Sequence, residues 1–408
     1  MIPLGRQRRR SVPAALIAAI VLVGVATGCS PTSHKSAPTA GASTSAIPTP
    51  TPTPTVDPIA GLSMAQRVGQ VFMVGTPAST AAAITKQLVS GRHVGNIFLS
   101  GRSRSGVAAT AAVVAQFRAL VGPDSTGGEP LLVATDQEGG EVQVLHGPGF
   151  SSIPTGVAQS RLTTAALAAG ATGWGNQLAA AGVNMDLAPV VDVVASPATA
   201  RQNPPIGGFQ REIGFVPSAI AAHAAIFRDG MGSAHVITVD KHFPGLGLVG
   251  ANTDNRSGVT DRVTASSSPS VGIYRTEIAA GLQCVMVSSA TYSHIDPKRP
   301  GVFSPAMVTG LLRKGLGFDG VIMTDDVSAA RQTLAWSPAS RAILSLQAGV
   351  DLVLVSDNPA VAAQMVDAVL AKANADPAFA EIVNNAARRV VELKAANGLV
   401  VAPAAPTG

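Results

Sequence analysis

Residues 317–326 read Gly317-Phe318-Asp319-Gly320-Val321-Ile322-Met323-Thr324-Asp325-Asp326, an apolar run that ends abruptly in two carboxylates. A strand of this kind is buried on both faces in a parallel sheet, so its polar residues emerge only at its carboxyl end. In α/β proteins that edge is where chemistry takes place. A second apolar run, Val236 to Val239, ends similarly in Asp240-Lys241-His242-Phe243-Pro244-Gly245. The two polar clusters predict one shared site at the carboxyl edge of a sheet.

Six further short apolar runs recur along the chain: Val71–Val74, Asn96–Leu99, Leu131–Ala134, Val183–Leu187, Cys284–Val287 and Leu352–Val355. Ala-rich stretches of helical length separate most of the runs, among them Thr164–Ala181, Ser218–Met231 and Pro359–Lys372. Strands alternating with helices predict an α/β fold, and eight strands favour a (β/α)8 TIM-type barrel, formed by a single catalytic domain over residues 59–400. A doubly wound open sheet is the alternative, but no Gly-x-Gly-x-x-Gly follows the first run and no phosphate loop occurs.

Polar residues follow five consecutive strands of this prediction. They are Asp136-Gln137-Glu138-Gly139-Gly140, Pro189–Asp192, Lys241-His242, Ser288–Tyr292 and Asp325-Asp326. A single polar strand end is often a helix cap, but five in succession would desolvate charge at the rim of the sheet without a purpose. We therefore expect them to line one polar mouth.

The first 58 residues differ in composition from the rest. Residues 1–28 combine four Arg with an apolar run from Val12 to Ala26, which predicts an export signal, and the Arg8-Arg9-Arg10 cluster leaves a twin-arginine route open. The signal ends before Cys29 in a pattern that resembles a lipoprotein signal. Residues 29–58 are rich in Ser, Thr and Pro and predict a disordered stalk, and residues 401–408 predict a flexible tail. We expect an exported protein, held at the cell membrane by a lipid on Cys29 and facing the cell wall.

The net charge and the numbers and spacing of Cys and His argue against several classes of protein. The formal charge is +5, but the four Arg of residues 1–28 account for four of these charges, so the remainder carries +1 and no nucleic-acid partner is expected. Cys284 lies in an apolar run and predicts a buried thiol. The seven His lack ligand spacing and no Gly-x-Ser-x-Gly occurs, so neither a metal, a cofactor nor a serine nucleophile is predicted. Nothing suggests a partner chain, and we expect a monomer.

Five motifs together resemble glycoside hydrolase family 3, specifically its bacterial β-N-acetylglucosaminidases, over about residues 60–395. They are Asp136-Gln137-Glu138-Gly139-Gly140, residues 184–192 (Asn-Met-Asp-Leu-Ala-Pro-Val-Val-Asp), Lys241-His242-Phe243-Pro244-Gly245, residues 317–326, and residues 348–355 (Ala-Gly-Val-Asp-Leu-Val-Leu-Val). The layout of signal, stalk and domain is similar to the lipoprotein type found in mycobacteria and their relatives. The resemblance implies a barrel that hydrolyses glycosidic bonds without a metal.

The resemblance also implies roles for individual residues. Asp325 corresponds to the nucleophile, which attacks the anomeric carbon and forms a covalent glycosyl-enzyme. Asp326 is left as a cap of the following helix or as a residue that supports the nucleophile from behind. Lys241 and His242 correspond to residues that bind sugar hydroxyls, and Lys241 also keeps a nearby carboxylate ionised. Asp136 corresponds to a carboxylate that accepts hydrogen bonds from the sugar, and Arg211 to an arginine of the pocket.

The general acid departs from the family pattern. These acetylglucosaminidases usually carry Asp-Ser-His on the loop after Lys-His-Phe-Pro-Gly. Here Asp254 takes the Asp position, but Arg256 falls where the His is expected, and an Arg cannot donate a proton near neutral pH. Asp254, with its pKa raised by burial on a mobile Gly-rich loop, is our candidate acid. His294 and Glu138 are alternatives, and Glu141 stands where the family often has Arg.

The sequence thus predicts a retaining exo-β-N-acetylglucosaminidase acting on N-acetylglucosamine-containing cell-wall muropeptides through Asp325. One alternative keeps the family and changes the sugar, to that of a β-glucosidase or β-xylosidase, although Asp325-Asp326 suits the acetylglucosaminidases better. The other is a non-catalytic sugar-binding lipoprotein, motivated by the missing His. The aglycone and the choice between hydrolysis and phosphorolysis stay open.

Overall fold

The computed structural model describes residues 57–399. The predicted signal over residues 1–28, the lipidation site Cys29, the stalk up to residue 56 and the tail 401–408 lie outside this range and stay predictions. Among the helices of the described part, none is long and apolar enough to cross a membrane. Its α-helices are α1 (Met64–Gln70), α2 (Ala83–Arg92), α3 (Gly106–Arg118), α4 (Gly156–Gln159), α5 (Thr164–Ala180), α6 (Pro217–Gly232), α7 (Pro269–Ala279), α8 (Pro338–Ala348), α9 (Ala362–Ala375) and α10 (Pro377–Ala396).

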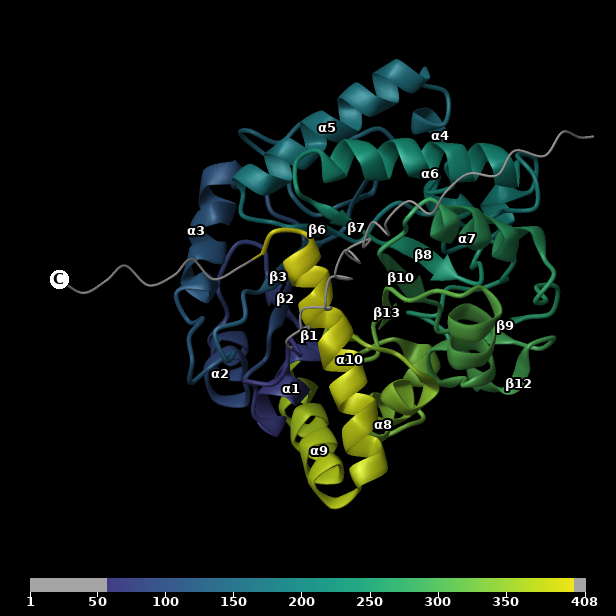
Figure 1. Cartoon of the computed structure of the whole chain (residues 1–408). Coiled ribbons are helices and arrows are strands. Elements are labelled where there is room, and N and C mark those ends of the chain that lie inside the picture. Colours follow the sequence, from purple (N-terminus) through teal and green to yellow (C-terminus); the bar gives the residue numbers. More distant parts are fainter. Residues whose placement is uncertain (1–56, 400–408) are drawn as a thin grey trace, which may run out of the picture. The chain divides into compact units, whose positions relative to one another are not determined.

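Each of the eight predicted apolar runs overlaps a strand. In chain order these strands are β1 (Phe72–Pro77), β2 (Asn96–Ser100), β3 (Leu132–Thr135), β6 (Met185–Asp186), β7 (Ile237–Thr238), β10 (Cys284–Val287), β13 (Val321–Thr324) and β14 (Val353–Val355). They pair in parallel in the order β14-β1-β2-β3-β6-β7 and, in a second sheet with β8 (Asp240–Phe243), in the order β13-β10-β8. The helices lie around the strands, which gather at the centre of the view (Figure 1).

The two parallel sheets approach each other at both ends. Only Val239 separates β7 from β8 along the chain. At the other end, the Thr324 amide donates to the Leu352 carbonyl at 3.0 Å, and the Leu352 amide donates to the Ile322 carbonyl at 3.1 Å. The prediction of an α/β fold with parallel strands is confirmed, whereas the closed (β/α)8 barrel stays a prediction.

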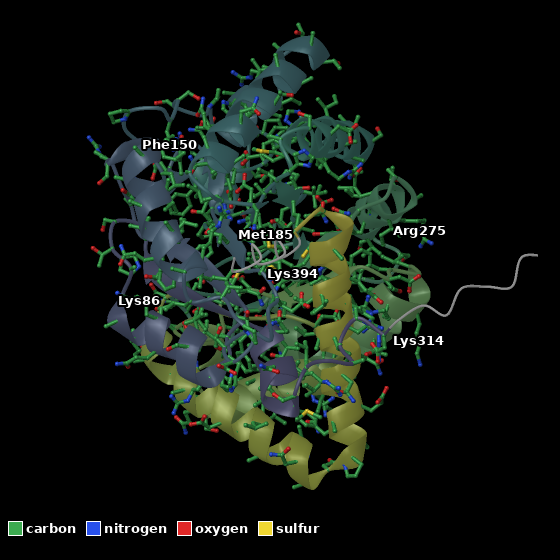
Figure 2. All side chains as sticks on the ribbon, turned by 60° about the vertical axis from the view of Figure 1, so that its left-hand side comes forward. Lys86, Phe150, Met185, Arg275, Lys314 and Lys394 are labelled. Carbon is green, nitrogen blue, oxygen red and sulfur yellow. The ribbon has the colours of Figure 1, made fainter. Side chains whose placement is uncertain are left out.

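Side chains alternate between the two faces of these strands and form two apolar cores. One core lies between the strands and the helices and includes Val74, Ile97, Val133, Val285, Ile322 and Val353. The other collects residues from every one of the eight runs: Met73, Phe98, Leu132, Met185, Ile237, Cys284, Met323 and Leu354. Cys284 is a buried free thiol, as predicted. Helix α10 adds Leu393 to the second core. The next residue of this helix is the buried Lys394, which Figure 2 labels.

Local sequence explains why the long helices form where they do. In α5, the Thr163 hydroxyl accepts the Ala166 amide at 3.2 Å and caps the first turn, which is the preferred use of Thr at this position. Leu167, Ala171, Trp174 and Leu178 then recur at helical spacing and are buried. A Cβ placed on Gly230 of α6 would lie 2.5 Å from the Ala171 Cβ, so the small residues allow close packing of the two helices.

Several elements were not predicted from the sequence. Residues 240–243, read as the polar end of a strand, form β8 and pair with β10. Two small additions lie beyond the main strands: the hairpin of β4 (Gln137–Gly139) and β5 (Val142–Gln143), and the three strands β9 (Thr260–Asp261), β11 (Thr291–Tyr292) and β12 (Asp296–Pro300). A π-helix occupies Ala306–Gly315, and short 3-10 helices occupy Ala200–Gln202, Gly207–Phe209, Gly301–Phe303, Arg331–Thr333 and Pro359–Val361.

Candidate active site

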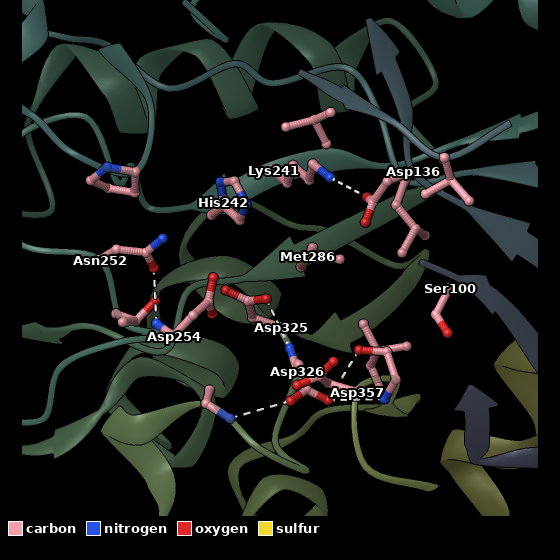
Figure 3. A pocket seen from close by; sticks show the side chains of 18 of the residues that line it. Ser100, Asp136, Lys241, His242, Asn252, Asp254, Met286, Asp325, Asp326 and Asp357 are labelled. Atoms are coloured by element: carbon pink, nitrogen blue, oxygen red, sulfur yellow. Dashed lines mark hydrogen bonds and ion pairs between the residues drawn. The ribbon is translucent and has the colours of Figure 1, made fainter. Parts of the chain in front are cut away.

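A cavity of about 530 Å³ opens at the carboxyl ends of the strands (Figure 3). The side chains that line it come from strands β8 and β10 and from the loops after β2, β3, β6, β8, β13 and β14, as expected for a parallel α/β fold. All six residues predicted for catalysis and substrate binding line this one cavity: Asp136, Arg211, Lys241, His242, Asp254 and Asp325. Asp136 and Arg211 are 75 residues apart in the sequence, so the fold alone brings them together.

Lys241 is the centre of an ion-pair network on one wall of the cavity. Its ammonium group contacts Asp136 Oδ1 at 2.7 Å and Glu138 Oε1 at 2.6 Å, and its side chain is almost fully buried. Arg211 donates to both oxygens of Glu138, each at 2.7 Å, in the two-pronged geometry that a guanidinium forms with a carboxylate. Asp136 is the more open of the two acids and can accept hydrogen bonds from a ligand in the cavity.

Glu138 is held ionised in this network. Burial works against its charge, but Arg211 and Lys241 outweigh burial and lower the pKa of Glu138 to about 2. An acid with so low a pKa carries no proton to donate near neutral pH. Its geometry suits a supporting role instead, since it neutralises Arg211 and Lys241 and fixes their side chains beside the cavity.

His242 is oriented by Asp192. The Asp192 carboxylate contacts His242 Nδ1 at 2.7 Å and accepts the backbone amides of His242 at 3.1 Å and of Leu246 at 2.6 Å. Nδ1 therefore carries the proton that Asp192 accepts, and Nε2 lies on the other side of the ring, 3.5 Å from Arg211 Nη2. The sequence places Asp192 within one of the five motifs but indicates no role for it.

Asp325 follows β13 directly and points into the cavity (Figure 3). Its backbone amide donates to the Val287 carbonyl at 3.0 Å, and the Asp326 amide donates to its Oδ1 at 2.8 Å. Burial raises the pKa of Asp325 and so does the charge of Asp326, while His242, the Asp326 amide and Lys241 lower it. A carboxylate set at the end of a rigid strand keeps a fixed position relative to a bound substrate.

The Asp326 carboxylate binds groups of two neighbouring loops. Its carboxylate accepts the Ser328 hydroxyl at 2.6 Å, the Ser356 amide at 2.9 Å and the Ala329 amide at 2.8 Å. These bonds join the loop after β13 to the loop after β14. No helix begins at Asp326, since the next helical turn starts at Arg331 with Ala330 before it, so the helix-capping role predicted for Asp326 is wrong and its role is to support the loop beside the nucleophile.

Asp254 faces Asp325 across the cavity, and the two carboxyl groups point toward each other (Figure 3). Asp254 lies on the loop after β8, opposite the loop after β13, and its side chain is exposed to the solvent of the cavity. The surrounding protein displaces part of the water around this carboxyl group and raises the pKa of Asp254 to about 6; Asp325 and Asp326 add to this rise, and Arg211 and His242 oppose it. An acid with this pKa can both donate and accept a proton near neutral pH.

The alternative proton donors lie in less suitable places than Asp254 for donating a proton to a ligand in the cavity. Arg256 is exposed and does not line the cavity. His294 is also exposed and does not line it; its Nε2 contacts the Arg262 carbonyl at 2.8 Å. Glu138 is ionised in its ion pairs. Among residues 57–399, no group of three or more His, Cys, Asp or Glu side chains is placed to hold a metal.

Comparison with known proteins agrees with this geometry. The family described as Glycosyl hydrolase family 3 N terminal domain matches residues 63–393. A Beta-hexosaminidase of Methylococcus capsulatus is 32% identical over 284 residues, which covers 67% of this chain and 79% of that protein.

Two solved structures extend the comparison. The Beta-N-acetylhexosaminidase of Beutenbergia cavernae is 58% identical, with a TM-score of 0.81 over 83% of this chain and 99% of that one. LpqI of M tuberculosis is 27% identical, with a TM-score of 0.69 over 82% of this chain and 94% of that one. Since the family match spans most of the sequence and includes the whole cavity, the chain belongs to glycoside hydrolase family 3.

Proposed function

We propose that the protein is a retaining exo-β-N-acetylglucosaminidase, which removes terminal N-acetylglucosamine from a glycan. One observation carries the proposal: Asp325 and Asp254 face each other across a cavity with sugar-binding chemistry. Relatives named Beta-hexosaminidase and Beta-N-acetylhexosaminidase support the choice of sugar. Paired carboxyl groups that flank the scissile bond are the machinery of retaining glycosidases.

In the first step Asp325 attacks the anomeric carbon. A bond forms from its carboxylate oxygen to the sugar, the bond from the anomeric carbon to the leaving oxygen breaks, and Asp254 gives its proton to that oxygen. The product is a covalent glycosyl-enzyme, and the released group departs as an alcohol. Asp325 has to be ionised and Asp254 protonated; His242 and Lys241 favour the ionised form of Asp325, and the raised pKa of Asp254 favours its protonated form.

In the second step a water molecule replaces the released group. Asp254, now ionised, accepts a proton from the water, whose oxygen attacks the anomeric carbon and frees Asp325. The charge of Asp325, which raises the pKa of Asp254 in the empty cavity, is absent in the glycosyl-enzyme. The pKa of Asp254 therefore falls between the two steps, which suits its change from acid to base.

The other polar side chains hold the sugar. Lys241 and Arg211 donate to hydroxyl oxygens, His242 contacts them through Nε2, and Asp136 accepts from hydroxyl groups. Because Lys241, Arg211 and His242 are each fixed by a buried carboxylate, they lose little side-chain freedom when the sugar binds.

The test compares two chromogenic substrates that differ only at C2. We expect the purified protein to turn over 4-nitrophenyl N-acetyl-β-glucosaminide, and Asp325→Ala to abolish turnover while N-acetylglucosamine still binds. Mass spectrometry of Asp254→Ala with the same substrate should reveal a glycosylated peptide that contains Asp325. Faster turnover of the 2-hydroxy substrate would instead identify a β-glucosidase.

A second candidate function is a non-catalytic sugar-binding lipoprotein. The observation that favours it is Arg256, which is exposed where the family pattern expects a proton-donating histidine. This candidate predicts stabilisation by N-acetylglucosamine with no product at any pH.

We also propose that the eight parallel strands close into a (β/α)8 barrel. The core that collects side chains from all eight strands, the direct continuation of β7 into β8, and the hydrogen bonds between β13 and residue 352 support closure. We propose in addition that the protein is exported, that a lipid on Cys29 anchors it, that it acts as a monomer and that its substrates are cell-wall muropeptides. Cells that express the unmodified protein or Cys29→Ala can be labelled with a radioactive fatty acid. Only the unmodified protein should carry the label if Cys29 is lipidated.

A further inference from the structure

The segment that carries Asp254, here called the acid loop (residues 246–259), is fastened at its start by one buried amide side chain. Asn203 Nδ2 donates to the carbonyls of Leu246 and Val249, both at 2.9 Å. Its Oδ1 accepts the amides of Ile206 at 3.0 Å and Gly207 at 3.2 Å. All the hydrogen-bonding capacity of this amide therefore joins the acid loop to the neighbouring loop of residues 203–207.

A second buried amide fastens the end of the acid loop. Gln332 Oε1 accepts the Val259 amide at 2.9 Å, and Nε2 donates to the Val259 carbonyl at 3.1 Å. The Gln332 backbone amide donates to the Thr253 carbonyl at 3.1 Å, and the Arg331 amide donates to the Asp254 carbonyl at the same distance. The backbone of Asp254 is thus bound directly to the segment that follows the nucleophile.

Close packing adds a third point of attachment. A Cβ on Gly247 would lie 2.1 Å from the Val193 carbonyl oxygen, so the loop can approach there only because this residue is glycine. The Leu246 amide is also bound by Asp192, the residue that orients His242. Although the acid loop is rich in glycine, its main chain is therefore tied to three other segments around the cavity.

We infer, on the basis of the proposed function, that Asn203 and Gln332 are positioning residues, which hold Asp254 in place to protonate the leaving-group oxygen. Neither amide lines the cavity, so neither is expected to touch the substrate. Their effect is indirect. Gln332 lies seven residues after Asp325 and binds the acid loop, so it connects the segment that carries the nucleophile to the loop that carries the acid. A displacement of about 1 Å in such a group costs roughly 10²-fold in rate.

The experiment uses two substrates with the same sugar and different leaving groups. 4-Nitrophenol leaves with little help from an acid, whereas the sugar leaving group of N,N′-diacetylchitobiose needs protonation. We expect Asn203→Ala and Gln332→Ala each to lower kcat/KM for diacetylchitobiose by about 10²-fold. The kcat/KM for the 4-nitrophenyl substrate should change far less, and azide should accelerate its turnover by replacing the badly activated water.

The isosteric variants Asn203→Asp and Gln332→Glu keep the accepting oxygen but place a second carboxylate oxygen against the carbonyls that the amide donates to, so they should show a change of the same kind that is at least as large. Gln70→Ala is the matched control. Gln70 is a buried glutamine at the end of α1, before β1, and donates to the Thr126 carbonyl at 3.3 Å. It should lower the melting temperature and leave the ratio of the two kcat/KM values unchanged.

The outcomes separate this inference from the function on which it rests. If Asp254→Ala shifts the ratio of the two substrates but the amide variants lower both equally, the amides are only structural and the inference is wrong. If Asp254→Ala itself leaves the ratio unchanged, Asp254 is not the acid and both assignments fail. Without turnover of either substrate by the unmodified protein, the proposed function fails and the inference fails with it.

Discussion

The pH dependence of Asp254→Asn would test the assignment of the acid most directly. Asp254 has to carry a proton when the first bond breaks, and the raised pKa extends its protonated range upward from the ordinary value of 3.8 to about 6. The first cause of this rise is the partial loss of water around the carboxyl group, which the protein on either side displaces although the side chain stays open to the cavity. The charged and titratable groups that also act on this pKa are Asp325 and Asp326, which raise it, and Arg211 and His242, which lower it.

The pKa gives the magnitude of the expected effect. With a pKa of about 6, roughly nine tenths of Asp254 is protonated at pH 5, about one tenth at pH 7 and about one hundredth at pH 8. The kcat/KM for diacetylchitobiose should therefore fall about tenfold for each pH unit above 6. On the acidic side it should fall as Asp325 becomes protonated. Because the two acids interact, the acidic and basic limbs of the profile report apparent pKa values that belong to the pair and not to either residue alone.

The assay is a profile of kcat/KM for diacetylchitobiose between about pH 4 and pH 9, in the unmodified protein and in Asp254→Asn. The variant should lose about 10²- to 10⁴-fold at its best pH and should lack the basic limb. A basic limb near pH 6 that persists in Asp254→Asn would refute the assignment, because another group would then supply the proton.

Three further changes test other parts of the structure. Glu138→Gln should raise KM and lower the free energy of unfolding in urea by about 3–5 kcal/mol, because it removes the carboxylate partner of the buried Arg211 and leaves Lys241 with Asp136 alone. Since the pKa of Glu138 is lowered to about 2, its stabilisation should be lost as pH falls from 4.5 toward 2, and a loss above pH 5 would contradict this. Gly247→Ala should force the acid loop away from the Val193 backbone, slow diacetylchitobiose cleavage and lower the melting temperature; unchanged kinetics would disprove the tight packing. Burial lowers the pKa of Lys394 from 10.5 to about 7, so the unfolded chain binds the extra proton between these values and stability should rise with pH there. Lys394→Met should lack this rise, and identical melting curves in the two proteins would argue against the shift.

Local patterns in the sequence were enough to find the framework. The eight apolar, β-branched runs coincide with strands, because a strand buried on both faces needs such residues whatever its neighbours are. The polar residues after these strands line one cavity, because the carboxyl ends of parallel strands meet at one edge. For the same reason, the sequence pattern alone was enough to place Asp136, Lys241 and Asp325 at that edge.

Other features depend on contacts between segments that are far apart in the sequence. Glu138, an alternative proton donor on the sequence evidence, is ionised because Arg211 lies beside it, 73 residues further along the chain. Asp192 orients His242 across 50 residues. No local pattern records such pairs, since a carboxylate looks the same in a sequence whatever charge the fold places next to it.

The acid loop shows the same division most clearly. From its sequence alone, a Gly-rich segment with Asp254 predicts mobility, and only composition supports that prediction. In the folded chain, Asn203 and Gln332 bind its main chain from both sides, and Gly247 serves close packing. The sequence by itself determined the strands, the edge that holds the site and the kinds of side chain present there. The tertiary structure decided which of those acids has a lowered pKa and which a raised one, and which loop is held in place, because these properties depend on contacts and charges that only folding brings together.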